Sequence, residues 1–150
     1  MEGRSGDGAG PGRAATHRSR SLVIRLALDT NRYTDFAKGD KALTGLLERA
    51  ERIYLPFIVL AELRAGFAVG RRGAENERRL KQFIARSGVD PLFADETTTH
   101  HYASLFRQLR EAALPIPTND LWIAALVVQH DLVLCSRDEH FRNLPQIPLI

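Results

Sequence analysis

Short apolar segments alternate with segments of helical length along most of the chain, and this alternation limits the possible folds more than any other feature. The apolar segments are candidate strands and cover residues 22–28, 52–57, 89–95 and 132–136. Between them, apolar side chains recur at helical spacing over about 31–38, 41–51, 58–70, 73–87, 96–113 and 118–130. Strands that alternate with helices favour a parallel sheet whose two faces are both covered. We therefore expect a three-layer α/β fold, with a mostly parallel sheet of about four to five strands and helices on both faces.

Local signals set several boundaries of these elements. Asp95 stands just before the helix expected at 96–113 and is a candidate N-cap. Ser136 and Glu139 form the pattern S-x-x-E, which predicts a capping box for a short last helix. The sequence IPLI, at 147–150, is a candidate edge strand.

The chain divides into a polar segment and one domain. A length of 150 residues suits a single domain with one core. Residues 1–21 contain five of the eleven glycines and no large apolar side chain except Met1, so they cannot bury enough surface to offset the entropy of ordering them. We predict a disordered tail over 1–21 and a folded domain over 22–150. A start site that is not used in the cell would explain the tail equally well.

Composition excludes several classes of protein. The single cysteine, Cys135, excludes an internal disulfide framework and a multi-cysteine zinc site, and it favours a reducing cytoplasm. Every apolar run is far shorter than the ~20 residues that a membrane-spanning helix requires, so we expect no membrane association.

Basic side chains are concentrated between residues 71 and 86, where six of them stand against two acidic ones. Such a segment could follow a phosphate backbone, although a solvated helix face is the ordinary alternative. The candidate nucleic-acid-binding residues are Arg71, Arg72, Arg78, Arg79 and Lys81.

Four acidic residues stand out by position. Asp29 follows the first strand and Asp138 the last long one, so both should lie at the rim where parallel strands end. Glu62 lies on the helix after the second strand, and Asp120 in the first turn of a helix. Each one alone has an ordinary explanation, such as a turn cap or a favourable interaction with a helix dipole. Together they would repel one another without a counter-charge, and carboxylate oxygens favour Mg²⁺ or Mn²⁺ over Zn²⁺.

Neutral side chains beside these acids could orient them. The runs DTN and TND place hydroxyl and amide groups next to Asp29 and Asp120. These neighbours are Thr30, Asn31, Thr118 and Asn119. His140 is the histidine nearest to the acidic residues, and we interpret it as a surface or capping residue rather than a catalytic one.

The motifs LALDTN, LAELRAG, PTNDLWIAA and CSRDEHF occur in this order, and with them the chain resembles the PIN-domain family from about residue 23 to residue 150. Within that family it is similar to the VapC-type toxins of type II toxin–antitoxin systems. The resemblance implies a Rossmann-like PIN fold and a catalytic quartet of Asp29, Glu62, Asp120 and Asp138. It also implies a supporting role for Ser136, two residues before the last acid.

The resemblance further implies an activity and partners. The expected activity is that of a Mg²⁺-dependent endoribonuclease that hydrolyses RNA phosphodiesters with metal-activated water, leaving a 5′-phosphate and a 3′-hydroxyl. Asp29 and Asp120, followed by Asp138, are the expected direct metal ligands, and Glu62 would act through a water. The expected partners are RNA, a cognate antitoxin that covers the rim and apolar surface on the early helices, and a second copy of the chain.

Two other functions are compatible with a fold of this class. A noncatalytic RNA-binding module would bind RNA equally well in EDTA and would not cleave it. A receiver-like phosphoacceptor domain also places aspartate at strand ends around Mg²⁺, but no second aspartate accompanies Asp29 in a DxD arrangement and no lysine follows a late strand. Labelling with acetyl phosphate would distinguish that class.

Overall fold

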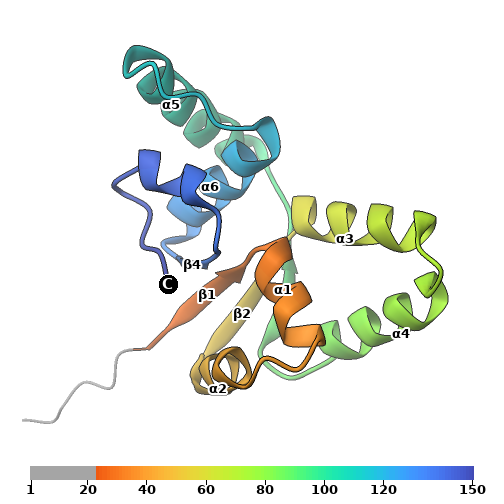
Figure 1. Cartoon of the computed structure of the whole chain (residues 1–150). Helices are drawn as coiled ribbons and strands as arrows, with labels where there is room; N and C mark the ends of the chain where they lie inside the picture. Colours follow the sequence, from red (N-terminus) through yellow and green to blue (C-terminus); the bar gives the residue numbers. More distant parts are fainter. Residues whose placement is uncertain (1–22) are drawn as a thin grey trace, which may run out of the picture.

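A parallel sheet of four strands forms the centre of the computed structural model, which describes residues 23–150 (Figure 1). The strands are β1 (Arg25–Leu28), β2 (Arg52–Pro56), β3 (Val89–Leu92) and β4 (Val133–Cys135), and their order across the sheet is β3-β2-β1-β4. All three strand pairings are parallel, which confirms the predicted sheet. The tail predicted for 1–21 lies outside the described residues.

Helices connect the strands and gather in two groups (Figure 1). One group follows β1 and β2, and the other consists of the last two α-helices and a short 3₁₀ helix near the C-terminus. The helices are α1 (Thr30–Ala37), α2 (Lys41–Arg49), α3 (Phe57–Val69), α4 (Gly73–Ile84), α5 (Glu96–Glu111) and α6 (Thr118–His130), and the 3₁₀ helix is Glu139–Asn143. None of the helices within residues 23–150 combines the length and the apolar character needed to cross a membrane.

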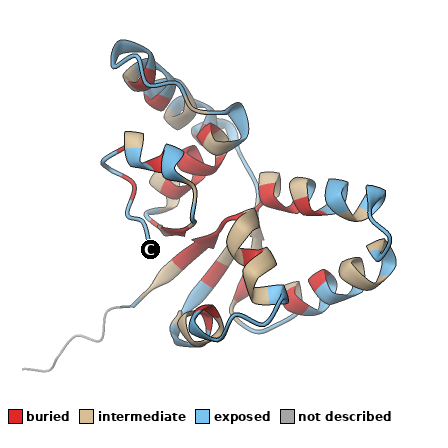
Figure 2. Cartoon of the chain, in the orientation of Figure 1, coloured by how far each residue is buried: buried red, intermediate tan, exposed pale blue. Residues whose placement is uncertain are grey.

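Strand β1 lies at the centre of the core. Leu26, Ala27 and Leu28 are all fully buried, although successive side chains of a strand point to opposite faces of the sheet (Figure 2). Both faces are therefore covered by helices, as expected for a three-layer α/β fold. Because β1 pairs with both β2 and β4, its carboxyl end lies beside the ends of two other strands.

Of the two helix N-caps predicted from the sequence, one is confirmed and one was wrong. Asp95 caps α5, since its side chain accepts from the Thr98 N–H at 3.1 Å and the Thr98 hydroxyl accepts from the Asp95 N–H in return. The capping box of Ser136 with Glu139 was wrong, because Asp138 is the N-cap of the 3₁₀ helix and accepts from the His140 N–H. Ser136 still continues the line of β4, with its N–H bonded to the Ile150 carbonyl.

The C-terminal residues add a short edge to the sheet. Leu134 and Leu149 form an isolated parallel bridge beyond β4, as expected for an edge segment at 147–150. The Leu134 N–H donates to the Pro148 carbonyl at 2.8 Å, and the Ile150 N–H donates to the Leu134 carbonyl at 2.9 Å. This edge holds the end of β4, from which the loop with Ser136 and Asp138 begins.

Candidate metal centre

Asp29 is fixed where β1 ends and α1 begins. Its N–H continues the sheet by donating to the Cys135 carbonyl at 3.0 Å. Its side chain is the N-cap of α1, with Oδ1 accepting from the Thr30 N–H at 2.8 Å. Oδ2 accepts from the Ser136 hydroxyl at 2.6 Å and from the Asn31 amide at 3.4 Å. Thr30, Asn31 and Ser136 therefore all donate hydrogen bonds to this carboxylate.

The surroundings of Asp29 act on its charge in opposite directions. Only 5% of the residue is exposed, and this burial raises the pKa of its carboxyl group. The hydrogen bonds from Ser136 and Thr30 lower the pKa, while the carboxylate of Asp138 raises it. A cation beside Asp29 would therefore stabilise the ionised form that the hydrogen-bond donors already favour.

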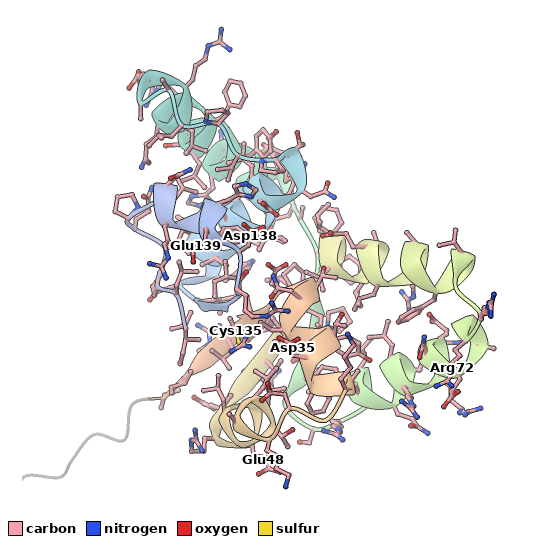
Figure 3. All side chains as sticks on the ribbon, in the orientation of Figure 1. Asp35, Glu48, Arg72, Cys135, Asp138 and Glu139 are labelled. Atoms are coloured by element: carbon pink, nitrogen blue, oxygen red, sulfur yellow. The ribbon has the colours of Figure 1, made fainter. Side chains whose placement is uncertain are left out.

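Asp120 and Asp138 face each other across His140. Asp120 lies in the first turn of α6, and Asp138 precedes the 3₁₀ helix on the loop after β4 (Figure 3). The His140 Nδ1 lies 3.2 Å from Asp120 Oδ2 and 3.0 Å from Asp138 Oδ1. One ligand atom of each of the three residues lies within 4.8 Å of the other two. This is close enough for one ion to contact all three.

The protonation of Asp120 and Glu62 responds to the same cluster. Burial and the carboxylate of Asp138 raise the pKa of Asp120 to about 6, although the hydrogen bond with His140 acts in the other direction. Burial and the charge of Asp29 raise the pKa of Glu62, which lies half-buried on α3. Carboxyl groups from four separate segments thus interact electrostatically, as expected for groups that lie near one another.

The arrangement suits a divalent cation. The converging donors are carboxylate oxygens, which Mg²⁺ and Mn²⁺ prefer, and a single imidazole nitrogen, which is a poor ligand for Mg²⁺. The Thr30 hydroxyl is buried and has no hydrogen-bond partner within the described part of the chain, so a polar atom at the site remains available. Asp120 and Asp138 are the carboxylates best placed to hold such an ion, with Asp29 and the His140 ring beside them.

His140 is the residue of the site that the sequence interpretation undervalued. It is exposed, as expected, but its ring bridges two of the four acidic residues. His140 stands two positions after Asp138 in the sequence, and this spacing brings it to the acidic residues only if the chain turns tightly there. The 3₁₀ helix makes that turn.

The remaining predicted residues lie outside the cluster. Thr118 and Asn119 are exposed in the first turn of α6. The basic residues lie on α4 and on the turn before it, and Arg72 is far from Asp138 in the view of Figure 3. Part of their charge is already neutralised, since Arg79 pairs with Glu75 at 2.9 Å. Their role in binding nucleic acid stays a prediction.

A family match is consistent with this geometry. The sequence matches the family model described as PIN domain over residues 26–147. The chain belongs to the PIN domain family. The matched span contains all four acidic positions and His140. The match confirms the family that the four motifs indicated.

Several of its relatives are VapC proteins. Ribonuclease VapC4 of Mycobacterium tuberculosis is 32% identical over 93 residues, which span 62% of this chain and 72% of the relative. The VapC ribonuclease Y4jK of Sinorhizobium fredii is 30% identical over 121 residues, which span 75% of this chain and 86% of the relative.

The fold is shared with known toxin–antitoxin complexes. A chain in the crystal structure of VapBC2 from Rickettsia felis, bound to a promoter DNA fragment, superposes with a TM-score of 0.76 at 25% identity, over 85% of this chain and 98% of that one. A chain of VapBC-1 from nontypeable Haemophilus influenzae gives a TM-score of 0.75 at 23% identity, over 85% and 97% of the two chains. The second likeness concerns the fold alone.

Proposed function

We propose that this PIN domain is a divalent-metal-dependent endoribonuclease and the toxin of a VapBC-type toxin–antitoxin module, acting in the cytoplasm. The observation that carries the proposal is the cluster of Asp120, Asp138 and His140, whose ligand atoms lie within 4.8 Å of one another. The Ser136 hydroxyl links Asp29 to the backbone of Asp138, and burial and the charge of Asp29 raise the pKa of Glu62. The names of the relatives, ribonucleases of the VapC group, support the same activity. The homodimer implied by the resemblance stays a prediction.

The side chains divide the work of hydrolysis between them. Asp29, Asp120 and Asp138 would hold Mg²⁺ or Mn²⁺, which when bound supplies positive charge for the phosphate and lowers the pKa of water. Hydrogen bonds from Ser136, Thr30 and Asn31 favour the ionised form of the Asp29 carboxylate against the effect of burial, and they fix its direction. Glu62 has a raised pKa, so its carboxylate is a better proton acceptor than an ordinary glutamate.

Cleavage assays with purified protein test the activity. We expect the chain, freed of antitoxin, to cleave RNA with Mg²⁺ or Mn²⁺ and to stop cleaving when EDTA is added. The products should carry 5′-phosphates, which a 5′-phosphate-dependent exonuclease degrades. Absence of cleavage with either metal, together with undiminished RNA binding in EDTA, would instead support a noncatalytic RNA-binding module.

A pocket on the helices that follow β1 and β2 is our candidate for the antitoxin site. It has a volume of about 310 Å³ and lies between α1, α3 and α4, with the apolar side chains of Leu63 and Phe67 and the cations Lys38, Arg72 and Arg79 in its lining. Apolar walls with a positive rim suit an extended or helical segment that is apolar and acidic. We propose this pocket as the antitoxin site, which gives part of the predicted nucleic-acid-binding cluster a protein partner.

The double variant Arg72→Glu/Arg79→Glu tests this assignment. We expect it to weaken antitoxin binding by about tenfold or more, because rim charges of the opposite sign repel an acidic segment. RNA cleavage by the free variant should not change. The antitoxin is expected in the neighbouring reading frame, and affinity can be measured by calorimetry, with Arg110→Glu on α5 as the control. If the double variant loses RNA cleavage but keeps its antitoxin affinity, Arg72 and Arg79 bind RNA rather than the antitoxin.

A further inference from the structure

The loop that carries Asp138 has its own attachment to α1. Arg137 is the residue between Ser136 and Asp138, and its guanidinium contacts Asp35 on α1 twice. Nε lies 2.8 Å from Asp35 Oδ2, and Nη2 lies 3.1 Å from Oδ1. The two residues are 102 positions apart in the sequence (Figure 3 labels Asp35 and Asp138).

The backbone of Arg137 makes a second link between the same two segments. Its N–H donates to the Asn31 side-chain carbonyl at 3.2 Å, and the Asn31 amide donates to Asp29 Oδ2. On the other side of Arg137, the Ser136 hydroxyl donates to the same Asp29 oxygen and accepts from the Asp138 N–H at 3.0 Å. The ion pair is thus one member of a network that joins the loop to Asp29.

Its geometry differs from that of an ordinary surface ion pair. The Arg137 side chain is 58% exposed, and single exposed pairs contribute only about 0–1 kcal/mol to stability. Here, however, the contact is bidentate and the Asp35 side chain is only 20% exposed. Asp35 also accepts from Arg32 at 3.2 Å on its own helix, which fixes the direction of the carboxylate. The hydrogen bonds from Arg137 and Arg32 lower the pKa of Asp35, so it is ionised at neutral pH.

We infer that the Asp35–Arg137 pair is a positioning device, which holds the loop of Ser136 and Asp138 against α1 so that Asp138 faces Asp120 and Asp29. The inference rests on the proposed function, because it assigns the pair a task at the metal-binding carboxylates. Arg137 and Asp35 act through Asp138 and need not touch the ion or the RNA. Without the pair, the loop keeps its connection to the C-terminal edge, and its remaining bond to a side chain of α1 is that from the Arg137 N–H to Asn31.

Mn²⁺ affinity, measured by titration with electron paramagnetic resonance, tests the inference. We expect Arg137→Gln and Asp35→Asn each to weaken binding by about tenfold, the lower end of the range for groups that orient metal ligands. The double variant should bind no more weakly than either single one, because both remove the same link. Arg137→Lys, which keeps the charge but not the bidentate contact, should lie between wild type and Arg137→Gln.

Controls separate positioning from general stability. Arg142→Gln removes the same charge from a side chain that is 72% exposed and, among residues 23–150, pairs only with Glu139, so its Mn²⁺ affinity should stay within about twofold of wild type. Thermal unfolding of the metal-free proteins should be alike for Arg137→Gln and Arg142→Gln. Asp35→Asn also removes the partner of Arg32, which makes Arg137→Gln the cleaner variant.

The outcomes of the inference and of the proposed function can be told apart. If wild type binds Mn²⁺, Asp120→Asn does not, and Arg137→Gln binds like wild type, the positioning role is overturned and the nuclease proposal stands. If wild type itself binds no Mn²⁺, the nuclease proposal fails. Amide hydrogen exchange of the metal-free protein then decides the inference: faster exchange at Arg137 and Asp138 in Asp35→Asn supports the anchor, and unchanged exchange overturns it.

Discussion

Replacing Asp29 with asparagine is expected to lower the rate of metal-dependent RNA cleavage on the order of a thousandfold, which corresponds to about 4 kcal/mol of lost transition-state stabilisation. The change removes one negative charge from the pocket in which Asp29, Asp120 and Asp138 interact. Rates should be measured under single-turnover conditions at saturating Mn²⁺, so that weaker metal binding is separated from slower chemistry.

The asparagine should fold because it keeps most of the contacts of Asp29. Asparagine is as good an N-cap as aspartate, so its carbonyl can accept from the Thr30 N–H. Its amide then faces Ser136 and Asn31, which both donate to Asp29 Oδ2 in the native protein. Because these groups are all donors, one hydrogen bond is lost, which lowers the free energy of unfolding by about 1 kcal/mol. Only an ionised aspartate accepts from all three groups at once.

Asp131→Asn is the matched control for this prediction. It makes the same chemical change at an exposed residue at the other end of α6 from Asp120. Asp131 has a left-handed conformation with φ of 52°, which asparagine adopts readily. Its cleavage rate should equal that of wild type. If Asp29→Asn cleaves RNA as fast as this control, Asp29 has no part in the chemistry.

The sequence was sufficient to predict which segments form the sheet and where the acids lie along it. Apolar strands between helices of adequate length imply parallel pairing, and parallel pairing places Asp29 and Asp138 at one rim. Asp29 lies beside the loop of Asp138 because Leu28 pairs with Cys135. This pairing depends on the strand order, which the hydrophobic pattern of the sequence alone does not specify. The resemblance to PIN domains indicated the quartet, but the orientation of each side chain depends on hydrogen bonds across the rim.

Contacts between exposed polar residues could not be predicted. The chain has 21 lysines and arginines and 18 acidic residues, so no local pattern indicates that Arg137 pairs with Asp35. The S-x-x-E pattern at Ser136 was misleading because the Ser136 N–H, just beyond β4, still bonds to the Ile150 carbonyl, and the Ser136 hydroxyl is already bonded to Asp29 and Asp138. His140 reaches the site only because Asp138 begins a 3₁₀ turn.

Asp120→Asn is expected to stabilise the metal-free protein while it abolishes Mn²⁺ binding. The carboxyl group of Asp120 has a pKa raised from 3.8 to about 6 in the folded protein, chiefly because of burial and then because of Asp138. A folded-state pKa above the unfolded value means that the neutral form is the one that folding favours. The stability that this group contributes is complete below about pH 4 and is lost as the pH rises through about 6.

Asparagine mimics the neutral form at every pH, so its advantage should grow with pH. At pH 7.5 we expect the free energy of unfolding of metal-free Asp120→Asn to exceed that of wild type by about 1–2 kcal/mol, a rise in Tm of about 3–8 °C. The variant also loses the contact between the Asp120 carboxylate and His140, which offsets part of the gain and keeps it at this modest size. Near pH 4 the two proteins should unfold alike.

Adding metal should reverse the order of the two proteins. Saturating Mn²⁺ stabilises whichever folded protein binds it, by an amount that grows with the ratio of metal concentration to Kd, so wild type should gain several degrees and Asp120→Asn almost none. Scanning calorimetry at pH 4, 6 and 7.5, with EDTA or Mn²⁺, measures both effects. If metal-free Asp120→Asn is less stable than wild type at pH 7.5, attractive contacts stabilise the Asp120 carboxylate. The site then has no charge repulsion for a cation to relieve.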